Sequence, residues 1–178
     1  MIDVAIGLRD HSGWAVAVVV SAEPRVLDRR RLTLCPDDLP RQVYHAAAGE
    51  PPDTAARLVA EVEAAATTAA AAEVAALVGE LRAAGHRVRG AALAADTVAV
   101  PAELAAILAS HPMLHAAEGE LYREALAEAL RVSGVPVIRH TRGELRPGDA
   151  ADLGRGLGPP WARDQKEAAA AALLALQV

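Results

Sequence analysis

The stretch Ile2-Asp3-Val4-Ala5-Ile6-Gly7-Leu8-Arg9-Asp10 near the start of the chain decides the fold. Its apolar residues fall at even positions, and small or polar residues fall between them. A period of two with β-branched residues is typical of a strand with two different faces. The small residues Ala5 and Gly7 predict that a helix packs closely on the second face.

The rest of the chain reads as an alternation of strands and helices. We expect the following elements: strands at 2–9, 14–20, 26–34, 88–95 and 135–141, and helices at 53–84, from 101, 110–133 and 162–176. Residues 35–52 and 142–160 are rich in Pro and Gly and read as irregular. This order predicts a single α/β domain over 1–178, with a mixed sheet of five strands, element order βββαβαβα, and helices on its faces.

Composition narrows the class of protein. The net charge of −5 counts against a dedicated nucleic-acid binder, although a local basic patch can act within an acidic whole. Lys166 is the sole lysine among 18 basic residues, which suggests a GC-rich bacterial genome. Cys35 stands alone, so no intrachain disulfide can form and a reduced cytoplasmic setting fits. We expect neither a signal peptide nor a membrane helix.

The order of the elements resembles the ribonuclease H-like superfamily, and within it the Holliday-junction-resolvase branch. The resemblance covers nearly the whole chain in layout. It implies a metal-dependent nuclease that acts on structured DNA or RNA, with Mg²⁺ or Mn²⁺ held by clustered carboxylates. The segments 115–123 and 158–167 also resemble uncharacterised bacterial proteins, from which no activity follows.

The acids of the resolvase branch lie on the first strand, at the end of the fourth strand and near the start of the last helix. Arg9 stands where the first-strand pattern has its aspartate, and Asp10 is displaced by one residue, onto the opposite face. A bulge in the strand would be needed to bring Asp10 to the expected face. Otherwise Asp3 is the remaining acid of the first strand.

The other two acids map directly onto Asp96 and Asp164, with Glu167 one helical turn further on. The resemblance therefore implies metal ligands at Asp3, Asp10, Asp96, Asp164 and Glu167, and catalytic residues at Asp10, Asp96, Asp164 and Glu118. Each acid also has an ordinary explanation. Asp10 suits a turn, Asp96 suits the start of a loop, and Asp164 suits the positive end of the helix dipole.

Basic residues gather after the fifth predicted strand. Arg139, Arg142 and Arg146 lead from that strand into the following loop, where guanidinium groups could grip phosphate. The ordinary explanation is a solvated surface in an arginine-rich protein. No aromatic residues interleave with the arginine clusters in the sequence, so stacking of single-stranded bases is not indicated.

A second set of polar residues lies on the helix that begins near residue 110. His111, His115, Glu118 and Tyr122 fall along one helical face. Two histidines four residues apart with a nearby carboxylate can ligate Zn²⁺, whereas a buried hydrogen-bonded cluster is the alternative. Gly119, on the same helix, predicts close packing against the small face of the first strand.

Three functions remain open from the sequence. The first is a nuclease of resolvase type. The second is a non-catalytic binding or assembly module of the same fold, which could form a homodimer; Arg9 and the acidic net charge favour it. The third is a histidine-based metal enzyme. The chain lacks a P-loop, a GxGxxG motif after a strand and a nucleophile elbow, which argues against nucleotide enzymes and serine hydrolases.

Overall fold

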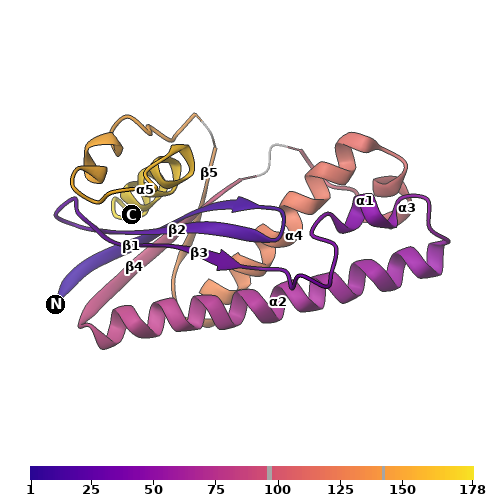
Figure 1. The fold of residues 1–178 in the computed structure, drawn as a ribbon, viewed down its shortest axis with the longest axis horizontal. Helices are drawn as coiled ribbons and strands as arrows, with labels where there is room; N and C mark the ends of the chain where they lie inside the picture. The colour runs from indigo at the N-terminus through magenta and orange to yellow at the C-terminus, as the bar shows by residue number, and fades with distance from the viewer. Residues whose placement is uncertain (96–97, 142) are drawn as a thin grey trace.

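The structure is a computed structural model that describes residues 1–95, 98–141 and 143–178. It contains the following strands and helices (Figure 1): β1 (Ile2–His11), β2 (Trp14–Ser21), β3 (Val26–Thr33), α1 (Val43–Ala47), α2 (Pro52–Ala83), β4 (His86–Ala94), α3 (Leu104–Leu108), α4 (His111–Val132), β5 (Val137–His140) and α5 (Arg163–Ala175).

The sheet has five strands in the order β3-β2-β1-β4-β5. Strands β1, β2 and β3 are antiparallel neighbours, whereas β4 runs parallel to β1 and β5 runs parallel to β4. His11 pairs with Trp14, so a two-residue turn at Ser12-Gly13 joins β1 to β2. Gly13 has a φ of +82°, a backbone conformation that favours glycine in such hairpins. The mixed five-stranded sheet expected from the sequence is confirmed.

The two faces of β1 meet different helices. Val4, Ile6 and Leu8 point into the main core, which α2 and α4 cover. Gly7 points to the other face, where a Cβ added to it would lie 1.7 Å from the carbonyl oxygen of Ala168 in α5. Figure 1 shows α5 on one side of the sheet, with α2 and α4 on the other. The expectation of a helix packed on the small face of β1 is therefore correct.

Gly119 serves a different purpose from the one the sequence suggested. A Cβ at Gly119 would lie 2.8 Å from a guanidinium nitrogen of Arg123, one turn along the same helix. The small residue leaves room for that side chain and not for β1, so the expected contact of Gly119 with Ala5 and Gly7 is wrong.

Helix α2 spans 32 residues and runs along one edge of the molecule in Figure 1. By length and composition alone it is apolar enough to cross a membrane, and 33% of its most apolar window is buried. Val59, Val62, Leu77 and Val78 join the main core beneath the sheet. This stripe packs α2 on the core, and much of the exposed remainder of the apolar window is alanine.

Two segments expected to be irregular contain short helices. Within residues 35–52, Val43 and Tyr44 begin α1 and are buried in the main core. Within residues 142–160, a single 3₁₀ turn covers Ala151–Gly154. Neither short helix has a long apolar period, which is the signal that indicates longer helices in a sequence.

Candidate active site

Asp10 lies near the carboxyl end of β1 and points toward α4. Its side chain is buried, and one carboxylate oxygen, Oδ2, accepts a hydrogen bond of 3.0 Å from Nη1 of Arg123. The other oxygen, Oδ1, is buried without a hydrogen-bond partner among the described residues. Pairing of β1 with β2 is regular through Asp10 and His11, so the bulge that would turn Asp10 to the other face is not found there. The guanidinium of Arg123 therefore provides the opposite charge that a buried carboxylate requires.

Arg9 projects from the opposite face of β1, toward α5. Its Nε lies 2.8 Å from Oε2 of Glu167, which makes an ion pair although the N–H is not directed well enough for a hydrogen bond. Arg163 donates a hydrogen bond of 2.7 Å to the other oxygen of Glu167. Partial burial alone would raise the pKa of Glu167, but Arg163 and Arg9 outweigh it, so the pKa lies below its usual value.

Asp164, in the first turn of α5, faces the end of the β1–β2 hairpin. Its Oδ2 lies 3.0 Å from Nε2 of His11, and the His11 ring stacks on Trp14 with centroids 4.0 Å apart. Arg31 of β3 lies over the same Trp14 ring at 4.1 Å. Trp14 thus lies between an imidazole and a guanidinium, in contact with both.

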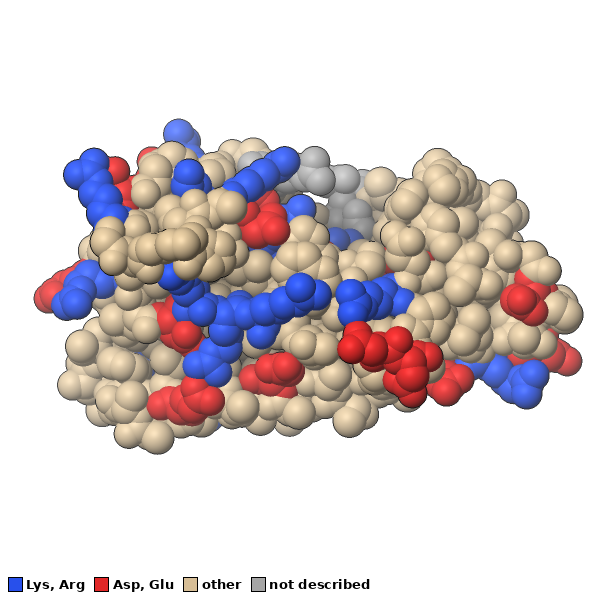
Figure 2. Space-filling model, viewed as in Figure 1, with Lys and Arg blue, Asp and Glu red and all other residues tan. Residues whose placement is uncertain are grey.

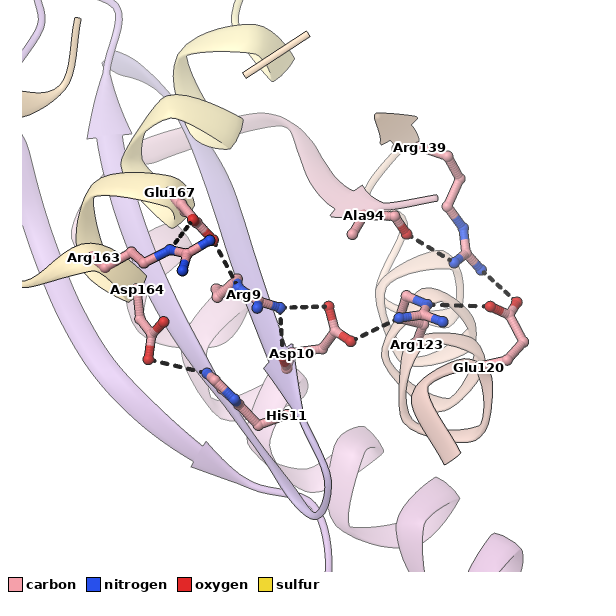
Figure 3. Close-up of polar contacts among 10 residues, drawn as sticks. All are labelled: Arg9, Asp10, His11, Ala94, Glu120, Arg123, Arg139, Arg163, Asp164 and Glu167. Carbon is pink, nitrogen blue, oxygen red and sulfur yellow. Dashed lines mark hydrogen bonds and ion pairs between the residues drawn. The ribbon is translucent and has the colours of Figure 1, made fainter. Parts of the chain in front are cut away.

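Charges alternate from α5 through β1 to α4 and β5. Figure 3 shows Glu167, Arg9, Asp10 and Arg123 in succession, each facing a group of opposite charge. Arg123 also contacts Glu120, and burial raises the pKa of that carboxyl. The arrangement neutralises the described acids in turn with groups from the protein itself.

Three of the predicted site residues lie elsewhere or outside the described residues. Asp3, at the start of β1, is paired with Arg87 and Arg89, and the hydrogen bond from Arg87 is the main cause that lowers its pKa to about 2. Glu118 is buried between α4 and α1 and faces His45. Asp96 lies outside the described residues. The structure therefore brings Asp10, Asp164 and Glu167 to one end of the sheet, apart from Asp3 and Glu118.

The arginines that the sequence predicted to bind phosphate do not share one environment. Arg139, on β5, pairs with Glu124 and approaches Glu120 at 3.8 Å. Arg146 is exposed in the loop that follows, and Arg142 lies outside the described residues. Arg139 is thus part of the charge network on the α4 side.

Sequence reasoning missed Arg123 and His11, which contact two of the predicted acids. Arg123 lies four residues after Gly119. A glycine in the middle of a helix could have indicated that a neighbouring side chain needs the space, and that side chain is Arg123. His11 follows Asp10 directly, so its face of β1, shared with Arg9, could be read from the period of two. Its contact with Asp164 depends on the position of α5, which no local pattern gives.

His140 at the end of β5 is buried, and its Nε2 has no hydrogen-bond partner among the described residues. Burial lowers the pKa of this imidazole below its usual value, although nearby carboxylates of Glu144, Asp10 and Glu167 partly offset the effect. His140 therefore takes up a proton below about pH 6.5 more readily in the unfolded chain than in the folded one.

We expect the free energy of unfolding to fall as the pH is lowered from 7.5 toward 5.5, because burial lowers the pKa of His140 in the fold below its value in the unfolded chain. Its contribution is no steeper than about 1.4 kcal/mol per pH unit, the slope for one proton. Urea unfolding of the parent chain and of His140→Gln across this range measures it. The stability difference between the two should change with pH, and parallel curves would show that His140 titrates alike in both states.

The strand order, the mixed pairing and the helices on both faces of the sheet define a ribonuclease H-like fold. Among solved structures, the fold is similar to RuvC of T. thermophilus in complex with a Holliday junction substrate, with a TM-score of 0.58 and 17% identity, over 96% of this chain and 90% of that chain. It is also similar to a Thermus thermophilus RuvC structure, with a TM-score of 0.54 and 16% identity, over 96% and 91% of the two chains. No protein-family model and no curated protein matches the sequence.

The described acids do not fit the metal centre that this fold implies. A divalent Mg²⁺ or Mn²⁺ needs several oxygen ligands that converge on one point. Among the described residues, the one group that brings three potential ligand atoms within 4.8 Å of one another consists of histidines and not of Asp10, Asp164 and Glu167. Arg9 and Arg123 instead contact Glu167 and Asp10 directly.

Proposed function

We propose that this chain is a non-catalytic ribonuclease H-like module that binds structured nucleic acid without cutting it. The observation that carries the proposal is the pair of internal cations at the end of β1, where Arg123 contacts Asp10 and Arg9 contacts Glu167. Each guanidinium supplies the positive charge that a divalent ion would supply in a nuclease. A guanidinium cannot generate a nucleophilic hydroxide from bound water as a metal ion does.

The binding surface of this proposal is the arginine-rich strand β3. Figure 2 shows basic side chains in a band across the middle of one face, at the level of β3 in Figure 1, with acidic side chains below along α2. Arg29, Arg30 and Arg31 line a groove there, together with Trp14 and Pro160. Trp14, which lines this groove, also stacks on His11, so the groove adjoins the end of β1. An edge strand with charged side chains is also protected from pairing with other sheets.

Not every guanidinium of this band is equally available for phosphate. Arg29 donates hydrogen bonds to the carbonyl oxygens of Leu157 and Pro160, and Arg30 pairs with Asp28 and Glu80. Arg31 is held by its contact with Trp14. Contact with an aromatic face leaves the edge N–H groups of a guanidinium directed outward. Arg31 is therefore the expected phosphate contact.

We expect the chain to bind branched DNA, and we expect Arg31→Gln to weaken binding equally for all sequences. The slope of log K against log salt concentration should fall by about 1, the value for one phosphate contact. Fluorescence anisotropy with a labelled four-way junction at several salt concentrations measures both quantities. Arg131→Gln, an exposed arginine paired with Glu128 on α4, is the matched control. Equal slopes for the parent chain and Arg31→Gln would remove β3 from the proposal.

A metal-dependent nuclease is the second candidate, because Oδ1 of Asp10 is buried without a hydrogen bond among the described residues. An unpartnered carboxylate oxygen is the group that a divalent cation would satisfy. Incubation of the parent chain with Mn²⁺ and a four-way junction separates the two candidates. The proposal above expects no cleavage, whereas cleavage that disappears in Asp164→Asn would establish the nuclease. Cleavage that persists in Asp164→Asn would mean that these acids are not its site.

A further inference from the structure

Three imidazole rings converge where α1 meets the start of α4, away from the acids at the end of β1. His45 comes from α1, and His111 and His115 lie one turn apart on α4. One ligand nitrogen from each ring lies within 4.8 Å of the other two. The ring centroids are 4.5 to 5.2 Å apart. The sequence indicated two of these rings, and the fold adds the third.

The spacing of the nitrogens matches tetrahedral coordination. Nε2 of His111 and Nε2 of His115 are 3.2 Å apart. For a Zn–N distance of roughly 2.0–2.1 Å, tetrahedral geometry places two ligand nitrogens about 3.3–3.4 Å from each other. The two Nε2 atoms are in hydrogen-bond contact, in which one donates to the other, and their separation is also the one that such an ion would require once it replaced the shared proton.

Glu118 fixes the third ring. Its carboxylate is 1% exposed, and Oε1 accepts hydrogen bonds from the backbone N–H of His45 at 3.2 Å and from Nδ1 of His45 at 2.8 Å. Since a carboxylate accepts, Nδ1 carries the proton and Nε2 carries the lone pair. A buried carboxylate that holds a histidine in this way is the usual support of a histidine ligand to a metal ion.

We propose that His45, His111 and His115 form a three-histidine site for Zn²⁺, with Glu118 as a positioning residue behind His45. Imidazole nitrogens suit Zn²⁺, whereas Mg²⁺ and Mn²⁺ prefer oxygen ligands. His111 and His115 are exposed, so a water molecule can complete the coordination. The ion would tie α1, and with it the segment between β3 and α2, to α4.

The site is independent of the function proposed above, because it shares no residue with the end of β1 or with β3. Tyr122, which the sequence grouped with these histidines, is not part of it. The ring of Tyr122 is buried in the main core, and its hydroxyl donates a hydrogen bond of 2.8 Å to the carbonyl oxygen of Arg41. Glu118 likewise acts through His45 and not as a ligand.

Competition with a chromophoric zinc chelator on the purified full chain tests the proposal. We expect one Zn²⁺ per chain, no displacement by Mg²⁺ or Mn²⁺, and a rise in melting temperature on Zn²⁺ addition. His45→Ala and His111→Ala should each weaken Zn²⁺ binding by at least tenfold. Glu118→Gln should weaken it by about 10- to 100-fold, the usual effect of losing the partner of a histidine ligand.

His86→Ala, which removes a histidine at the start of β4, is the control and should bind Zn²⁺ as the parent chain does. Far-UV circular dichroism identifies any variant that fails to fold. Because His111 is exposed, His111→Ala should fold and keep the proposal testable even if Glu118→Gln, at a buried residue, does not fold. Two results would overturn the proposal. One is absence of Zn²⁺ binding to the parent chain, and the other is undiminished affinity in His45→Ala, which would mean that the pair on α4 alone binds the ion at the surface.

Discussion

Gly7→Ala is expected to destabilise the fold by about 3 kcal/mol, at the upper end of the usual cost of overpacking. The added methyl group would lie 1.7 Å from the carbonyl oxygen of Ala168 and 2.5 Å from the amide nitrogen of Ala172. Both are backbone atoms of α5, so no side-chain rotation can relieve the overlap. Helix α5 as a whole would have to move away from the sheet.

The same displacement should disturb the charged groups that α5 carries. Asp164 and Glu167 face His11 and Arg9 across this interface, so both ion pairs should lengthen when the helix moves. Urea unfolding measures the loss of stability, and a melting temperature lower by roughly 6–12 °C is expected for a chain of this size. Amide hydrogen exchange of α5 reports whether the helix loosens first.

Gly79→Ala is the matched control for Gly7→Ala. Gly79 is exposed within α2, and a Cβ added there meets nothing within 4 Å. The same substitution should therefore stabilise the chain by up to about 1 kcal/mol through helix propensity. Equal effects at the two glycines would mean that α5 does not pack on β1 as closely as the structure has it.

The pattern of β1 shows how much of the fold the sequence could predict. Its period of two separates Leu8 from Gly7 and Asp10 from Arg9, and each pair lies on opposite faces in the structure. The element order then led to the mixed sheet. These features are local, or they follow from general rules for how strands and helices connect, so a single sequence is enough to predict them.

The candidate site was only partly predictable, because its contacts join residues far apart in the chain. The acids Asp10 and Asp164 were named from the sequence, but Arg123 was not. Arg123 and Asp10 are 113 positions apart, and their contact depends on where α4 crosses β1. His45 reaches His115 for the same kind of reason, because the short α1 is held against α4 by the main core.

Arg123→Met is the other substitution with a large expected effect. It leaves the buried Asp10 carboxylate without its hydrogen-bonding cation, and breaking a buried pair in this way costs about 3 kcal/mol or more. The side chains of Arg123 and Asp10 are 11% and 6% exposed, so water cannot replace the lost partner. Urea unfolding near pH 7 measures the difference.

Removal of both charges distinguishes a pair from two independent residues. In Asp10→Leu/Arg123→Met, the buried carboxylate that has only the ion pair with Arg9 at 3.9 Å left to it is gone, so the double variant should be more stable than Arg123→Met alone. Arg131→Met serves as the control on the same helix, because Arg131 is 71% exposed and its pair with Glu128 should contribute less than about 1 kcal/mol. A loss in Arg123→Met as small as in Arg131→Met would mean that Asp10 is hydrated.

Arg123→Met also tests the proposal that a guanidinium takes the place of a metal ion beside Asp10. If Arg123 occupies the place of a cation, its removal should leave Asp10 able to accept one, and Mn²⁺ should then raise the melting temperature of the variant more than that of the parent chain. Arg131→Met should show no such gain. An arginine that takes the place of a metal ion must compete with that ion for the carboxylate. An equal response to Mn²⁺ in the parent chain and both variants would therefore mean that Arg123 is only a structural partner of Asp10.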